Sequence, residues 1–173
     1  TDFRTTLAAV TPAVPGVNLT VIENGSRLQV TNDTADEVVV AVLINKKKAG
    51  LFSVEERIEL LQEVVAEIEA AGGTAMACAC DVANEESVKQ LVADTVAAYG
   101  KLDIVVNNAA TALSQPLGSL TAEAWGKVND VNLRGPVFLI EAALQHLLVS
   151  PHASVINVIS AGAFLPSVAS AMY

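Results

Sequence analysis

The stretch LDIVVNNAA, residues 102–110, decides the fold class of this chain. Its first half is a short apolar run rich in β-branched residues, which is typical of a strand buried in a parallel sheet. Ligands of such sheets bind beyond the carboxyl ends of the strands. The residues that follow the run, Asn107, Asn108, Ala109 and Ala110, therefore mark a candidate binding edge. Their small side chains let a flat ligand approach the backbone, and the amides can tie neighbouring loops together.

From residue 53 onward, helix and strand patterns alternate on both sides of this stretch. Apolar residues at helical spacing, opened by capping residues and closed by glycine, predict helices, and short apolar runs between them predict strands. The expected helices cover residues 53–72, 84–100 and 121–148, and the expected strands cover residues 74–82, 102–110 and 154–160. This order requires right-handed crossovers, so we predict the α/β class with a doubly wound parallel sheet. We expect the three strands to be neighbours, with Asp81, Asn107 and Ser160 along one edge.

The N-terminal part has a different pattern. Asn24-Gly25 lies between two alternating runs, and this pair is a strong hairpin signal because both residues tolerate positive φ. A two-residue loop there sets Val21 opposite Leu28. We therefore predict an N-terminal antiparallel β segment.

A third strand is expected over residues 37–44, which would extend the hairpin into an antiparallel meander. The change of pattern near residue 45 predicts two parts. Residues 1–45 form a β-rich segment, and residues 46–173 form the α/β domain.

Composition excludes several classes of function. The net charge of −9 disfavours nucleic acid as a partner, and no apolar stretch reaches the length of a membrane span. The two cysteines, Cys78 and Cys80, alternate along one strand-like run, which suits packing and provides too few ligands for a metal site. Unpaired thiols fit a reducing, cytoplasmic location.

The last expected strand leads to Ser160, and Tyr173 follows thirteen residues later. This pair, the Asp81-Val82 pair, the run from Asn107 to Ala110 and the helix with Asn132 together resemble the short-chain dehydrogenase/reductase family over about residues 53–173. The resemblance implies an incomplete Rossmann-like domain that binds NAD or NADP and transfers hydride between an alcohol and a carbonyl of a small-molecule substrate. The sequence also leaves open that copies of the chain associate with one another as a homo-oligomer.

The resemblance also implies a role for each matching residue. The cofactor-binding residues would be Asp81 at the adenine amino group, Val82 beside the ring, and Asn107, Ala109 and Ala110 beneath the nucleotide, with Ala110 in place of the family's glycine. The catalytic residues would be Ser160, which polarises the substrate oxygen, Tyr173, which is the general acid and base, and Asn132, whose backbone carbonyl holds a water of the proton relay. No metal is implied.

Pro136 gives a physical reason for the last of these roles. Proline has no N–H, so the Asn132 carbonyl, four residues earlier, loses its usual partner and the helix is expected to kink. A packing kink without catalytic meaning is the alternative.

Two features of the family are missing. The glycines before residue 51 are Gly16, Gly25 and Gly50, which cannot form a Gly-rich pyrophosphate turn, and the chain ends before the family's lysine. We therefore expect impaired activity, and the alternative is an inactive truncated or fused relic that acts at most as a binding or structural module. If residues 37–44 are the family's second strand, Lys46 to Lys48 would favour NADP, although a solvated turn is the favoured explanation of these lysines.

Overall fold

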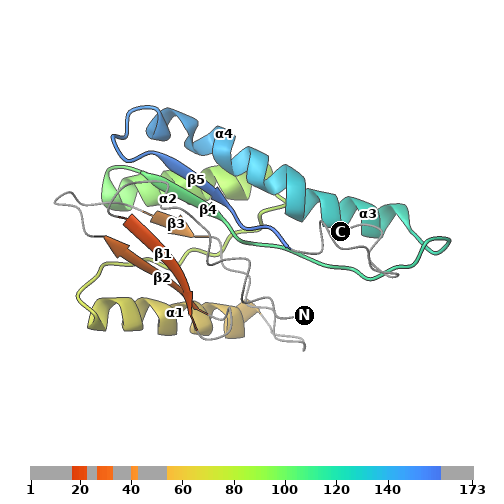
Figure 1. Cartoon of the computed structure of the whole chain (residues 1–173), viewed down its shortest axis with the longest axis horizontal. Coiled ribbons are helices and arrows are strands. Elements are labelled where there is room, and N and C mark those ends of the chain that lie inside the picture. The colour runs from red at the N-terminus through yellow and green to blue at the C-terminus, as the bar shows by residue number, and fades with distance from the viewer. Residues whose placement is uncertain (1–16, 23–26, 33–39, 43–53, 161–173) are drawn as a thin grey trace.

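The computed structural model describes residues 17–22, 27–32, 40–42 and 54–160 (Figure 1). The loop at Asn24-Gly25, the lysines 46–48 and Tyr173 lie outside the described residues. Within these ranges the chain forms two sheets, four α-helices and one π-helical segment. The π-helical segment lies between the third and the fourth α-helix. No helix in the described part is long and apolar enough to cross a bilayer.

The first sheet is an antiparallel pair. Strand β1 (Val17–Ile22) pairs with β2 (Arg27–Asn32), and Val21 lies opposite Leu28. This is the register that a two-residue loop at positions 24 and 25 predicts. The hairpin register was predictable because it depends on sequence-local residues alone.

The second sheet is parallel and has the order β3-β4-β5, from β3 (Val40–Val42), β4 (Ile104–Asn107) and β5 (Ser154–Asn157). The expected meander is therefore wrong in its third strand, because β3 pairs with β4 and has no pairing with the hairpin in the described residues. β4 is buried along its whole length, and an apolar neighbour such as β3 keeps its edge from water. The division after residue 45 stays a prediction, although β3 lies before it and β4 after it.

The position of β3 also corrects its expected place in the family's strand order. In the common doubly wound order, 3-2-1-4-5-6, the first strand lies beside the fourth. Here β3 occupies the place beside β4, with Ala41 opposite Val105. β3 therefore stands where a first strand would stand, although its sequence was interpreted as the second.

The expected strand over residues 74–82 is not formed. Residues 73–81 are neither helical nor part of a sheet, and they have no strand partner in the described part of the chain. A strand exists only through backbone pairing, which the alternation of side chains cannot supply. The segment still packs through Cys80 against the hydrophobic core.

The helices begin and end close to where local signals place them. They are α1 (Val54–Ala70), α2 (Glu85–Tyr99), α3 (Ala122–Asn129), the π-helical segment η4 (Asp130–Arg134) and α4 (Gly135–Leu147). The Asn84 side chain accepts from the Ser87 N–H at 3.0 Å, and Thr121 accepts from the Ala124 N–H at 3.2 Å, as N-caps do. Gly100 ends α2 with φ 75°, a conformation that favours glycine.

The core lies between the parallel sheet and the pair α2 and α4. Its buried members are Val88, Val92, Leu102, Val105, Leu139, Ala143 and Leu147. In Figure 1, α3 and α4 run along the upper side, α1 runs along the lower side, and both sheets lie between them. Because β4 is packed in this core, its carboxyl end, and with it the position where residue 108 begins, is set by the core.

A buried carboxylate braces the other end of β4. Asp103 is 1% exposed, accepts a hydrogen bond from the Ser150 hydroxyl and forms an ion pair with Lys101 at 3.1 Å. The Ser154 N–H donates to the Asp103 carbonyl at 3.0 Å. These contacts fasten the loop before β5 to the amino end of β4.

Candidate functional site

The carboxyl ends of β4 and β5 are joined by a pair of asparagines. Asn107 lies opposite Asn157 in the parallel register, and its Nδ2 donates to the Asn157 Oδ1 at 2.9 Å. Asn107 is 5% exposed, and its Oδ1 has no hydrogen-bond partner within the described structure. A buried acceptor without a hydrogen bond costs about 1–3 kcal/mol, so a ligand that donates a hydrogen bond to this oxygen would recover that free energy.

The residues after β4 are held from the opposite side by Asn132. The Thr111 N–H donates to the Asn132 Oδ1 at 2.8 Å, and the Asn132 Nδ2 donates to the Thr111 carbonyl at 2.8 Å. Thr111 is buried, Ala109 is half-buried and Ala110 is exposed. One side chain thus satisfies both main-chain groups of a buried residue and fixes the run from Asn107 to Thr111 against η4.

Asn132 owes its position to an irregular helical turn. It lies in η4, where the Gly135 N–H bonds the Asp130 carbonyl five residues earlier. Pro136 follows at the start of α4 and cannot donate to the Asn132 carbonyl. The structure has a single π-turn immediately before the proline, a feature that is frequent at functional sites, whereas the kink itself stays a prediction.

The Asp81-Val82 pair lies in a compact turn before α2. The Asp81 Oδ1 accepts from the Ala83 N–H at 3.0 Å, and the Asp81 carbonyl accepts from the Asn84 N–H at 2.9 Å. Its backbone N–H donates to the Ser87 hydroxyl at 3.0 Å. Among the residues that the structure describes, none bonds the second carboxylate oxygen, Oδ2, and the side chain is exposed. Asp81 therefore offers one fixed, unused acceptor to solvent.

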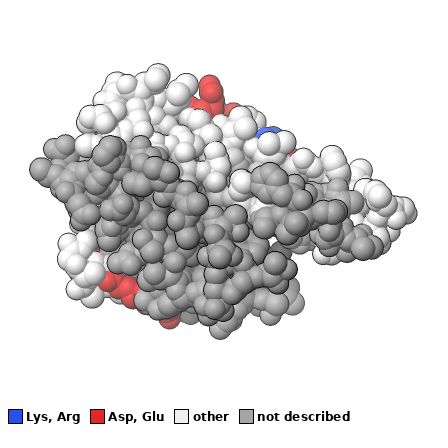
Figure 2. All heavy atoms as spheres, viewed as in Figure 1, with Lys and Arg blue, Asp and Glu red and all other residues white. Residues whose placement is uncertain are grey.

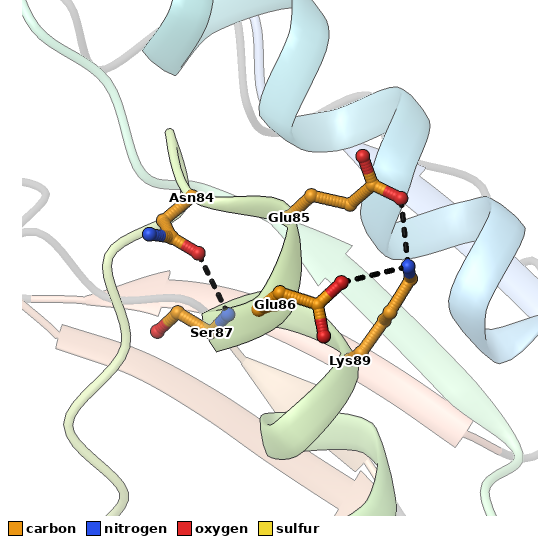
Figure 3. A network of polar contacts seen from close by, with 5 residues as sticks. All are labelled: Asn84, Glu85, Glu86, Ser87 and Lys89. Atoms are coloured by element: carbon orange, nitrogen blue, oxygen red, sulfur yellow. Dashed lines mark hydrogen bonds and ion pairs between the residues drawn. The ribbon is translucent and has the colours of Figure 1, made fainter.

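The first turn of α2 supports this arrangement (Figure 3). The Asn84 side chain points at the Ser87 N–H, while the Lys89 ammonium lies between two carboxylates, at 2.8 Å from Glu85 and 3.0 Å from Glu86. The two glutamates raise the pKa of Lys89 by accepting its hydrogen bonds. All three charged side chains are well exposed, so these pairs add little stability and serve mainly to order the surface of the helix.

Ser160 is half-buried and lies three residues beyond the end of β5. It therefore follows Asn157, the partner of Asn107, on the strand next to β4. Its expected partner Tyr173 lies outside the described residues. The structure thus brings together Asn107 with Asn157 and Asn132 with Thr111, whereas the pairing of Ser160 with Tyr173 stays a prediction.

The two thiols have no sign of reactivity. Burial raises the pKa of Cys78, and burial raises the pKa of Cys80 as well, although the hydroxyl of Ser87, which donates to its sulfur at 3.6 Å, opposes that rise. Both cysteines are unpaired. Within the described ranges no group of three His, Cys, Asp or Glu side chains is placed to hold a metal ion.

Sequence reasoning missed three residues of this region, Thr111, Asn157 and Arg134, and it assigned to Gly135 only a loosening of the turn before Pro136. Asn157 could have been found, because the parallel register of two strands with similar patterns sets it beside Asn107. Thr111 had no local signal, since its partner Asn132 is 21 residues away.

The comparisons with known proteins agree on one family. A family model described as short chain dehydrogenase matches residues 38–173. A short-chain dehydrogenase/reductase, FrzI, of Cladobotryum sp is 40% identical over 102 residues, which are 59% of this chain and 39% of that protein. An uncharacterized oxidoreductase of Staphylococcus saprophyticus is 28% identical over 172 residues, which are 99% of this chain and 66% of that protein.

Solved structures give the fold. A metagenomic short-chain oxidoreductase, crystallised in complex with NADP, is similar with a TM-score of 0.63 and 31% identity, over 67% of this chain and 53% of that one. The shared architecture is the Rossmann-type α/β fold. The chain spans from about two fifths to about two thirds of the length of the two relatives described above.

Proposed function

This chain belongs to the short-chain dehydrogenase/reductase family, and from that premise we propose that it is an NAD(P)-dependent oxidoreductase that transfers hydride between an alcohol and a carbonyl. The observation that carries the proposal is the double hydrogen bond between Asn132 and Thr111, at 2.8 Å each. This clamp holds the asparagine expected in the proton relay against the residues that follow β4. The substrate is therefore expected to bind beyond the carboxyl ends of β4 and β5.

The described residues fit a dinucleotide at this edge. The unused Asp81 Oδ2 can accept from the adenine amino group, with Val82 beside the ring. Within the described residues the buried Asn107 Oδ1 has no donor, and Ala109 and Ala110 present only a methyl group each to a flat ligand. The bound NADP of the metagenomic relative supports this kind of cofactor, which would donate or accept the hydride at its nicotinamide ring. The preference for NADP that the lysines at positions 46–48 would give requires them to follow the family's second strand. Because β3 takes the place of a first strand, the proposal names NAD or NADP without a preference.

The catalytic residues act on the proton and the substrate oxygen. Ser160 donates a hydrogen bond to that oxygen, Tyr173 gives or takes its proton, and the Asn132 carbonyl orients a water that links this proton to solvent. Pro136 supports the last role, since it has no N–H to occupy the carbonyl. The two unpaired cysteines support a cytoplasmic location.

One observation favours the alternative, a non-catalytic binding or structural module. β3 lies beside β4, in the place of a first strand, but Gly50 is the sole glycine in the eleven residues after Val42. A Gly-rich turn in that place would bring backbone N–H groups to the pyrophosphate. We therefore expect weak cofactor affinity and low turnover.

Turnover separates the two functions. The purified chain is mixed with NADPH and a panel of small ketones and aldehydes, and NADPH absorbance is followed beside a Tyr173→Phe variant. Slow oxidation that depends on the carbonyl and disappears in the variant supports the oxidoreductase. NADPH binding without any turnover supports a binding module. The absence of both binding and turnover contradicts the oxidoreductase and supports a structural module.

We further propose that two copies of the chain associate through the outer face of η4 and α4. Exposed apolar residues form one stripe there, away from the core: Leu133 (63% exposed), Val137 (55%), Leu144 (42%) and Leu148 (77%). An antiparallel pairing of two helices that sets Val137 opposite Leu144 also sets Leu133 opposite Leu148. The stripe is thus self-complementary, as a two-fold interface requires.

Glu141 is exposed on the same side of α4, between Val137 and Leu144, so each copy brings one carboxylate to the middle of this interface. Figure 2 shows acidic side chains at the upper and lower edges of the view, while most of the described residues in that view are uncharged. Light scattering should give a dimer for the unmodified chain and a monomer for Leu144→Glu. Val149→Glu is the control, because Val149 is 82% exposed but lies beyond the helix and off the stripe. A monomeric unmodified chain would contradict the proposed interface.

A further inference from the structure

A hydrogen bond from a charged side chain joins the turn at residues 81–84 to η4, the helical segment that contains Asn132. The Arg134 Nη2 donates to the Ala83 carbonyl at 3.0 Å. The guanidinium is also held by Asp130, at 3.3 Å from its Oδ1, and lies 5.9 Å from the centre of the Phe138 ring. Three partners therefore fix its direction, which an exposed arginine on its own would not have.

Gly135 lets the turn approach the helix. It is buried, and a Cβ at this position would lie 2.5 Å from the Val82 carbonyl oxygen and 3.2 Å from its carbon. Its φ of −56° and ψ of −52° are ordinary helical values, so the backbone conformation does not require glycine. The close approach of the Val82 peptide is the reason that a side chain is excluded here.

These two contacts act on the residue that orients Asp81. The Ala83 N–H donates to the Asp81 Oδ1 and the Ala83 carbonyl accepts from Arg134, so Ala83 is held on both sides. The carboxylate then presents its other oxygen, Oδ2, in one direction. A ligand that needs this acceptor meets it already oriented and loses less entropy on binding.

We propose that Arg134 and Gly135 are positioning residues that set the Asp81-Val82 turn for the adenine end of a dinucleotide, a role that rests on the proposed function. The same helical segment clamps Thr111 through Asn132, so one element positions both the adenine end and the residues after β4. Neither Arg134 nor Gly135 touches the ligand.

The test measures the two halves of the cofactor separately. The dissociation constants of ADP and of reduced nicotinamide mononucleotide are determined by NMR titration for the unmodified chain, Arg134→Met, Arg134→Lys and Gly135→Ala. Gly126→Ala is the matched control, because its new Cβ, in α3, would have no atom within 4 Å.

Arg134→Met and Gly135→Ala should weaken ADP binding about tenfold, which corresponds to about 1.4 kcal/mol, and leave nicotinamide mononucleotide within about twofold. Arg134→Lys should recover part of the loss, since it restores a charged donor without the fork. Gly126→Ala should bind both ligands like the unmodified chain. In the absence of any ligand, hydrogen exchange at the Ala83 amide should be faster in Arg134→Met and unchanged in Gly126→Ala.

The outcomes distinguish this inference from the proposed function. If the unmodified chain binds ADP and the variants bind it equally well, the positioning role is wrong and the proposed function stands. An equal loss for both ligand halves would mean general damage to the fold and would also overturn the positioning role. Failure of the unmodified chain to bind either half would overturn the proposed function, and the inference with it.

Discussion

Replacing Asn132 with alanine should destabilise the chain by removing a clamp that nothing else in the described structure can replace. The change deletes two hydrogen bonds of 2.8 Å and leaves the N–H and the carbonyl of Thr111 without partners. Thr111 is 9% exposed, so water reaches these groups only in part. At about 1–2 kcal/mol for each group, the loss should be about 2–4 kcal/mol. Domains of this size are stable by about 5–15 kcal/mol, so the loss is a large fraction of the total.

Urea unfolding monitored by far-UV circular dichroism measures this loss, and fluorescence of Trp125, the single tryptophan, gives an independent probe. Asn129→Ala is the matched control. Its amide, at the end of α3, donates to the Trp125 carbonyl at 2.9 Å in an exposed contact, so its removal should change the free energy of unfolding by less than about 0.5 kcal/mol. Equal midpoints for Asn132→Ala and Asn129→Ala would refute the clamp.

Three further predictions concern other parts of the molecule. Thr121→Ala removes the N-cap bond to the Ala124 N–H and should cost about 1 kcal/mol in thermal unfolding, whereas Thr121→Ser should cost much less. Asp103→Ala deprives a buried network of its acceptor and should cost about 3 kcal/mol; a loss below about 1 kcal/mol would show that the network is dispensable. Burial raises the pKa of Cys78 and Cys80, so the unfolded state loses these protons first, and stability should fall as the pH rises above the unfolded thiol value of about 8.5. Replacement of both cysteines by alanine should reduce that alkaline decline, and an identical decline in the variant would disprove its assignment to the thiols.

The sequence could predict what depends on near neighbours. The N-caps at Asn84 and Thr121 and the hairpin register need only residues within a few positions, and each is found where the local pattern places it. The strand over residues 74–82 failed for the opposite reason. Its alternating pattern was real, but a strand depends on a partner, and partners are chosen by the whole fold.

The site residues divide in the same way, into those that a local signal predicts and those that depend on distant contacts. Asn107 and Asn132 were found from motif and position, because the carboxyl ends of strands and a proline four residues later are readable signals. Of their partners, Asn157 could be predicted only once β4 and β5 were paired in register, and Thr111 could not be predicted. Thr111 and Asn157 are joined to them across 21 and 50 residues, and Gly135 is informative only once the Val82 carbonyl is seen beside it. The spacing of side chains along the sequence does not show which distant residues come into contact with them.

One titration tests the central claim, that the edge formed by the Asp81 turn and the residues after β4 is a dinucleotide site. The amide resonances of the 15N-labelled chain are followed while NADPH is added to millimolar concentration. Saturable shifts should concentrate at residues 81–83 and 107–111 and leave the hairpin residues 17–22 unchanged. The absence of saturable shifts, or shifts confined to other parts of the chain, would contradict the claim.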